Sequence, residues 1–193
     1  MLILFKSLVL PRVEYSSQLW SPVNIGKIRR IEAVQRNFTS KIWGMEKLDY
    51  WERLKKLQLF SLERRRERYM ILYTFKIIEN YVPNFASYRF KIGTYQNIRR
   101  GRFCSIPALK TRAKAGMKTM VDASFAVMGP RLFNSLPKYL RNFQGSLESF
   151  KSKLDKYLRT VPDQPALLKY PGQSSESNSL LHQLPSMSDD CNC

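Results

Sequence analysis

Apolar positions recur at three- and four-residue steps between Asn24 and Ile42, which is the period of one face of an α-helix. That face is formed by Ile25, Ile28, Ile31, Gln35, Phe38 and Ile42, and Val34 widens it. Basic residues, Lys27, Arg30, Arg36 and Lys41, occupy other positions of the helical wheel. Asn24 is a suitable N-cap, and Gly44 stands where a helix is expected to stop. We predict an amphipathic helix here; a core-facing stripe with an ordinary solvated back would give the same pattern.

Similar patterns predict further helices on both sides of this one. They cover residues 1–10, a kinked segment 11–19 after Pro11, residues 50–57 after the cap Asp49, 62 to about 80 after the cap Ser61, 124–135, and 146–159 after the cap Ser146. The helix from Leu62 carries four Arg in five positions, Arg64, Arg65, Arg66 and Arg68. Four such side chains cannot share one face, so some are expected to meet solvent or phosphate and others to pair with Glu63 or Glu67.

The pattern changes after Pro83. Short aromatic or alternating runs such as Tyr88–Ile92 lie between glycines and prolines and indicate strands or irregular structure. Arg99, Arg100 and Arg102 surround Gly101 there; a phosphate-contacting loop is conceivable, and an ordinary basic loop is the favoured explanation. From Val161 onward Pro, Ser, Gln and Asn dominate, and hydrophobic residues are too sparse for a core. We therefore predict a mainly α fold: a helical bundle over 1–86, a smaller region with short strands and two helices over 87–161, and a disordered tail over 162–193.

The net charge of the chain indicates what kind of partner it binds. The chain has 193 residues and a formal net charge of +18. The last thirty residues hold one Lys against one Glu and two Asp, so the excess belongs to the part that should fold. A basic excess of this size favours a polyanionic partner, nucleic acid first and an anionic membrane second. By charge and helical position, the best candidates for nucleic-acid contact are Lys27, Arg30, Arg36, Arg65 and Arg66.

Other classes of site find little support in the sequence. Three Cys and one His give neither a disulfide framework nor a zinc site, and no cofactor motif is present, so we expect no catalytic residue, metal or cofactor. The apolar start lacks signal-peptide features and no run is long enough to span a membrane, so an intracellular location, nuclear or cytoplasmic, is expected. We expect Glu14, Tyr15 and Trp20 to pack with their polar ends satisfied.

Several stretches resemble the C-terminal part of reverse transcriptases from non-LTR (LINE-type, jockey-like) retrotransposons. They are Phe5–Val9, Pro11, Glu14–Tyr15, Trp20–Pro22, Ile31–Glu32, Val34–Arg36, Tyr50, Arg53–Leu54, Leu57, Leu62–Glu63, Arg65–Arg66, Tyr73, Phe75–Lys76, Ser124–Val127, Gly129–Pro137, Phe150–Lys151, Val161–Pro165 and Ser177–Leu181. Each motif is weak alone, but their order and spacing together are specific. The family usually has Trp where Phe133 stands.

The resemblance implies that residues 1 to about 86 correspond to the helical thumb, which grips the primer–template, and that the fingers and palm are missing partners. Polymerase chemistry needs carboxylates that hold two metal ions. The only adjacent Asp pair, Asp189–Asp190, lies in the Ser-rich tail and is interpreted as accidental. An apolar patch at Ile3, Phe5, Leu8 or Val9 is expected where the palm would pack.

The sequence thus leads to a fragment of an RNA-directed DNA polymerase without its catalytic palm, which binds the backbone of a primer–template, RNA, DNA or hybrid, without reading sequence. Two alternatives stay open. One is a decayed or domesticated retrotransposon remnant that acts as a basic protein-interaction module or has no function. The other, an intact enzyme, would need an active site that the sequence does not reveal.

Overall fold

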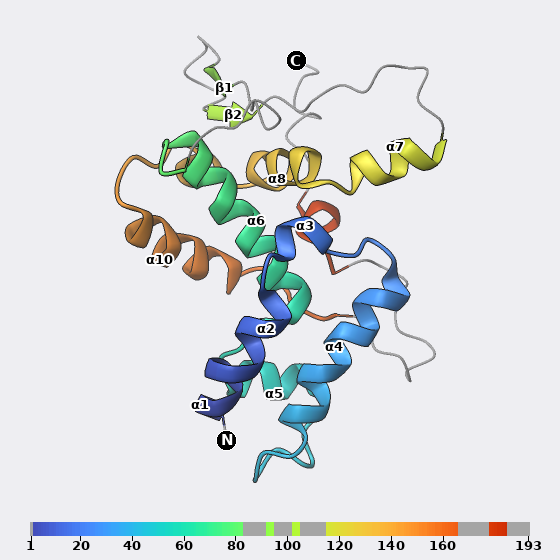
Figure 1. Ribbon diagram of the computed structural model, residues 1–193. Coiled ribbons are helices and arrows are strands. Elements are labelled where there is room, and N and C mark those ends of the chain that lie inside the picture. The colour runs from blue at the N-terminus through green and yellow to red at the C-terminus, as the bar shows by residue number, and fades with distance from the viewer. Residues whose placement is uncertain (1, 83–91, 95–101, 105–114, 166–177, 185–193) are drawn as a thin grey trace. The chain divides into compact units, whose positions relative to one another are not determined.

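A computed structural model of the chain describes residues 2–82, 92–94, 102–104, 115–165 and 178–184 (Figure 1). It is mainly helical, which confirms the predicted fold class. The chain divides into two compact units: unit 1 contains Met1–Glu67 and Asp163–His182, and unit 2 contains Arg68–Pro162 and Gln183–Cys193. The division falls inside one helix, between Glu67 and Arg68.

Unit 1 follows the predicted helices closely. It contains α1 (Leu2–Leu4), a π-helical turn η1 (Phe5–Val9), α2 (Leu10–Glu14), α3 (Ser17–Trp20), α4 (Ile25–Thr39), α5 (Tyr50–Lys56) and the first turns of α6 (Leu62–Ile78). Pro11 is the second residue of α2, directly after the π-helical turn, so residues 2–14 stay helical although Pro11 has no N–H to donate. Asp49 and Glu52 form a reciprocal capping box at the start of α5. Helix α4 ends at Thr39, before the expected Ile42, and Gly44 adopts a positive φ of 78° in the turns that follow.

Two apolar clusters hold unit 1 together. Phe5, Leu10 and Leu62 form one, and the ring of Phe5 stacks on that of Phe38 with centroids 4.2 Å apart. Tyr50, Leu54 and Leu59 form the other. The expected apolar patch is therefore wrong for Phe5, which is 1% exposed, whereas Ile3 and Leu8 are 81% and 58% exposed.

Unit 2 contains the rest of α6 and the elements β1 (Ile92–Thr94), β2 (Arg102–Cys104), α7 (Ala115–Asp122), α8 (Phe125–Asn134), α9 (Lys138–Arg141) and α10 (Leu147–Leu158). The two strands pair antiparallel, with Gly93 opposite Phe103. The side chains of Asn134 and Asn142 bond the backbone of β2, at 2.8 Å to Cys104 N and 2.6 Å to Arg102 N. Helices α7 and α9 were not among those predicted.

The core of unit 2 forms where α8 and α10 meet α6. Phe75 of α6 stacks on Phe150 of α10 with ring centroids 3.9 Å apart, and both are fully buried. Gly129 allows the close approach of α8, because a Cβ there would lie 2.6 Å from Thr74 Oγ1 and 2.8 Å from Phe125 Cε2. Most of the buried residues of the stretch Gly129–Pro137 therefore serve packing.

Some sequence expectations fall on other parts of the chain. The strand-like run at Tyr88–Lys91, the basic loop at Arg99–Gly101 and the pair Asp189–Asp190 lie outside the described residues. Arg102, which is described, forms an ion pair with Glu79.

Removal of the Phe150 ring tests this core. We expect Phe150→Ala to lower the free energy of unfolding by about 3–5 kcal/mol, because the substitution leaves a cavity against Phe75. Ser152→Ala, at an exposed position of the same helix, should change it by no more than about 0.5 kcal/mol. Urea denaturation followed by circular dichroism measures both, and equal effects would contradict a core centred on this stack.

Candidate functional site

Helix α4 presents basic side chains to solvent because its opposite side is anchored inside unit 1. The Asn24 side chain accepts hydrogen bonds from Gly26 N at 2.9 Å and Lys27 N at 3.2 Å, which fixes the start of the helix. Ile28, Glu32, Gln35 and Thr39 form the buried side. Lys27 and Arg30 are exposed and Arg36 is partly exposed.

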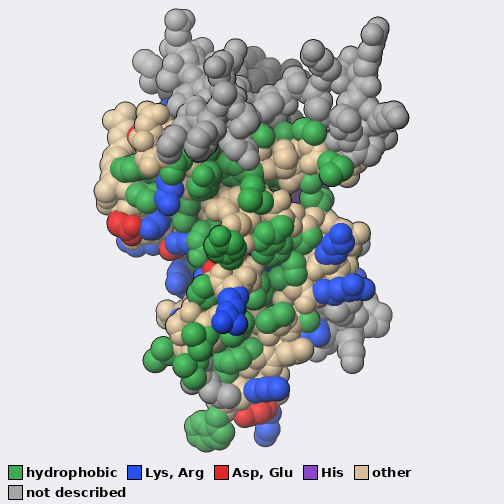
Figure 2. All heavy atoms as spheres, in the orientation of Figure 1, with side chains coloured by type: hydrophobic (Ala, Val, Ile, Leu, Met, Phe, Trp, Pro, Cys, Tyr) green, Lys and Arg blue, Asp and Glu red, His purple; other side chains and the backbone are tan. Residues whose placement is uncertain are grey.

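We call these three cations, Lys27, Arg30 and Arg36, the α4 basic face; Arg30 lies opposite the buried side of the helix, and Lys27 and Arg36 lie to either side of it. Lys27 and Arg36 are nine positions apart, which is roughly 14 Å along the helix and about two and a half turns around it. Among the described residues, none of the three forms an ion pair. Figure 2 shows Lys and Arg side chains over α4, between apolar side chains. The sequence placed these residues correctly on one helix, and the structure leaves all three unpaired by acidic groups of the described chain.

Arg65 and Arg66, the other two candidates, have different surroundings. Arg65 forms two bonds with the Glu14 carboxylate, one of them from Nη2 to Oε2 at 3.0 Å. Arg66 is 2% exposed, and burial lowers the pKa of its guanidinium while the carboxylates of Glu32, Glu63 and Glu67 oppose that shift. Both side chains are thus engaged within unit 1 and do not join the α4 basic face.

Glu32 fixes the orientation of α4 relative to α6. Its carboxylate accepts hydrogen bonds from the Tyr50 hydroxyl and from the backbone N–H groups of Leu62 and Glu63, the latter two at 3.1 and 3.3 Å. These N–H groups belong to the first turn of α6, which has no partners within its own helix. The Gln35 amide donates to Phe60 O at 2.9 Å beside it. Helix α4 therefore supplies the cap of α6. Because Glu32 lies thirty residues before Leu62, no local sequence motif indicates this cap.

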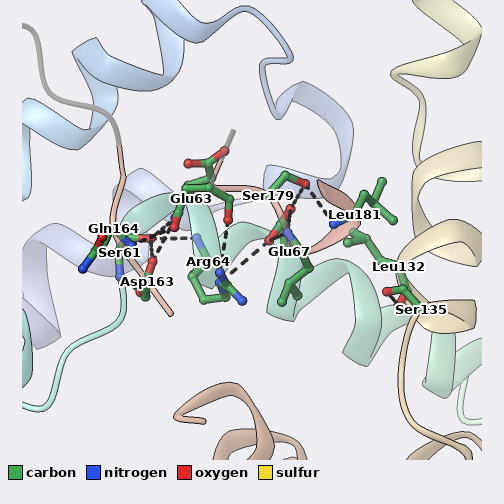
Figure 3. Close-up of polar contacts among 12 residues, drawn as sticks. Ser61, Glu63, Arg64, Glu67, Leu132, Ser135, Asp163, Gln164, Ser179 and Leu181 are labelled. Carbon is green, nitrogen blue, oxygen red and sulfur yellow. Dashed lines mark hydrogen bonds and ion pairs between the residues drawn. The ribbon is translucent and has the colours of Figure 1, made fainter. Parts of the chain in front are cut away.

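A C-terminal segment completes the same region. Asp163 accepts hydrogen bonds from Ser61 N and Ser61 Oγ, both at 2.7 Å, and Leu180 N donates to Glu67 at 3.1 Å. Arg64, fully buried, donates to Asn178 O at 3.1 Å. Figure 3 shows Arg64 and Glu67 beside Asp163, Gln164 and Ser179.

Within the predicted disordered tail, the structure describes residues 162–165 and 178–184, and the second stretch includes the short helix α11 (Leu180–Gln183). Composition missed them because single polar contacts to α6, and not a hydrophobic run, hold them in place. Leu180, which is 0% exposed, is an apolar anchor of the second stretch.

Next to the α4 basic face lies an open groove of about 650 Å³, lined by Arg12, Val13, Tyr15, Ser16, Trp20, Arg30, Ile31 and Val34. Tyr15 was expected to pack, and this is wrong: its side chain is 78% exposed. Trp20 is 41% exposed, and its indole N–H donates to Tyr15 O at 2.7 Å. Sequence reasoning did not connect Arg12 and the two aromatic residues with Arg30, since helices α2, α3 and α4 meet only in the folded unit.

Comparison with protein-family models, with curated proteins and with solved structures finds no match for this chain. No helix in the described part of the chain has both the length and the apolar character that crossing a bilayer requires. Across the ranges that the structure describes, no three His, Cys, Asp or Glu side chains gather as metal ligands. The geometry of unit 1 is thus the basis for a functional conclusion.

The ion pair between Arg65 and Glu14 is expected to stabilise the fold. Arg65→Ala should lower the free energy of unfolding by about 1–3 kcal/mol, because it leaves the Glu14 carboxylate, 7% exposed, without its charged partner. Glu14→Gln in the same chain should restore part of the loss, as a double-mutant cycle would show. Equal stability of Arg65→Ala and wild type would contradict a stabilising ion pair between Arg65 and Glu14.

The buried carboxyls predict an unusual pH dependence. Burial raises the pKa of Glu32 and of Glu67 from the usual 4.5 to about 7. Between these values the folded chain holds protons that the unfolded chain has released. The free energy of unfolding should therefore fall as pH rises from about 4.5 to 7, by about 1.4 kcal/mol per pH unit for each carboxyl, and level off above that range.

Glu67→Gln should remove the Glu67 share of this slope. Glu148→Gln, at a side chain 78% exposed, serves as the control and should leave the slope unchanged. Chemical denaturation at a series of pH values measures it. A wild type whose stability rises through this range would show that both carboxyls are ionised in the folded chain.

Proposed function

We propose that unit 1 binds the sugar–phosphate backbone of duplex nucleic acid, without sequence preference, through the α4 basic face. The observation that carries the proposal is that one capped helix bears the exposed Lys27 and Arg30 and the partly exposed Arg36, none with an acidic partner among the described residues. A polyanion supplies the charges that the chain itself does not. Each cation that meets a phosphate releases condensed counterion, and this release drives binding.

The resemblance to the C-terminal part of non-LTR reverse transcriptases gives the proposal its biological setting. In that setting unit 1 acts as a thumb that grips a primer–template, in the nucleus or the cytoplasm, and contributes binding and not chemistry. Two features support it: the fold is helical over the thumb-like stretch, and the solvent-facing cations sit on a helix and not in a loop. Backbone contacts position a duplex and carry no sequence information.

One observation favours the alternative, a protein-interaction module. Ile3, Leu4 and Leu8 are 81%, 60% and 58% exposed on consecutive turns at the start of the chain. Apolar side chains gathered in this way favour contact with another protein surface. The same surface suits a palm domain if the thumb assignment holds, so this patch and the α4 basic face can serve different partners.

A salt titration tests the proposal. The logarithm of affinity for duplex DNA or an RNA–DNA hybrid should fall linearly with the logarithm of salt concentration. Lys27→Ala, Arg30→Ala or Arg36→Ala should each lower the slope by about 0.9 and weaken two unrelated sequences alike. Fluorescence anisotropy with labelled duplexes measures affinity and slope together.

Two variants of α4 provide matched controls. Arg36→Lys keeps the charge and should keep the slope, whereas Asn37→Ala changes an exposed neutral residue of the same helix and should alter nothing. Arg65→Ala should change stability more than slope. If affinity is insensitive to salt, or if Asn37→Ala lowers the slope as much as Arg36→Ala does, the basic face is ordinary solvated surface.

A further inference from the structure

The groove beside α4 combines apolar and aromatic walls, which the proposed backbone contact does not use, with two guanidinium groups. Val13, Ile31 and Val34 give it apolar walls, and Tyr15 and Trp20 add aromatic rings. Arg12 and Arg30 bring two guanidinium groups to the same hollow. All of these residues lie in unit 1, so the groove belongs to a single compact body.

The two cations are available to a ligand. Arg12 and Arg30 are both exposed, and neither forms an ion pair with the acidic side chains of the described residues. Glu14, the acidic residue nearest in sequence to Arg12, is committed to Arg65. An occupant of the groove is therefore expected to carry negative charge.

A hydrogen bond to the backbone fixes the positions of the two aromatic residues. The carbonyl of Tyr15 accepts the Trp20 indole N–H at 2.7 Å, which closes a short loop between α2 and α3. Ser16, inside that loop, adopts a left-handed conformation with φ of 50°, a conformation that non-glycine residues seldom adopt. Tyr15, a residue that is 78% exposed, lines the groove, where a flat ligand can stack on its ring.

We propose that this groove holds an unpaired nucleotide of the bound nucleic acid, with its base stacked on Tyr15 and its phosphate paired with Arg12 and Arg30. An unpaired nucleotide joins a flat, largely apolar body to an anion, which matches aromatic rings, apolar walls and two free guanidinium groups. Base–aromatic stacking of this kind tolerates any base. The inference rests on the proposed function, because Arg30 belongs both to the groove and to the α4 basic face.

The test compares three DNA probes that share one duplex: a blunt end, a short single-stranded thymidine extension, and an abasic extension of the same length. The abasic strand carries the same phosphates, so any preference for thymidine over abasic extension reports the base alone. Wild type should bind the thymidine probe about 5- to 150-fold more tightly than the abasic probe, the range that stacking of one base gives. Fluorescence anisotropy at one salt concentration measures all three affinities.

Variants separate the groove from the basic face. Tyr15→Ala should abolish the preference for the thymidine probe and leave the affinity for blunt duplex unchanged, whereas Tyr15→Phe should keep the preference. Arg36→Ala, outside the groove, should weaken all three probes alike. Circular dichroism checks that each variant is folded.

The outcomes are distinguishable. Salt-dependent binding of blunt duplex with equal affinity for the thymidine and abasic probes would overturn the groove proposal and leave the proposed function standing. Absence of salt-dependent binding to every probe would overturn both. If Tyr15→Ala instead releases the chain from vesicles of anionic phosphatidylserine, with no effect on the thymidine preference, the groove is a lipid contact and the nucleotide proposal fails.

Discussion

The N-terminus of α6 is the point on which the folded unit 1 depends. Its first N–H groups have no partners in their own helix, and its first turns bury two acidic and two basic side chains, Glu63, Arg64, Arg66 and Glu67. Glu32 from α4 and Asp163 from the C-terminal segment supply the missing acceptors. Loss of either one would leave buried polar groups without partners, which costs more than the same bond would contribute at the surface.

This arrangement divides the positive charge of the chain into two kinds. In α6, Arg64 and Arg66 are buried, Arg65 pairs with Glu14 and Arg68 pairs with Asp155, so the densest basic cluster in the sequence is used inside the molecule. In α4, the anchoring of Glu32 and Gln35 turns the opposite, basic side to solvent. The net charge alone therefore overstates the number of cations that a polyanion can contact. Helix α4, which has fewer basic residues in a row than α6, leaves more of them accessible to such a partner.

The groove places aromatic and apolar side chains next to the α4 basic face. Arg30 continues the α4 basic face into a hollow whose other walls come from α2, α3 and the loop at Ser16. A backbone-binding surface that ends at exposed aromatic rings can hold a duplex and an unpaired nucleotide next to each other. Under the proposed function, a duplex on the α4 basic face would lie next to a groove that can take one unpaired nucleotide.

The sequence by itself determined the local elements, because caps and apolar periods act within a few residues. Asn24, Asp49, Ser61 and Ser146 cap helices as predicted, and the α4 cations lie where the helical wheel places them. Tertiary structure alone decided which charges are free. Glu32 reaches α6 across thirty residues, and Asn178 and Leu180 reach it across more than a hundred. Such contacts leave no periodic trace in the chain, since a single hydrogen bond or ion pair needs only one residue at each end.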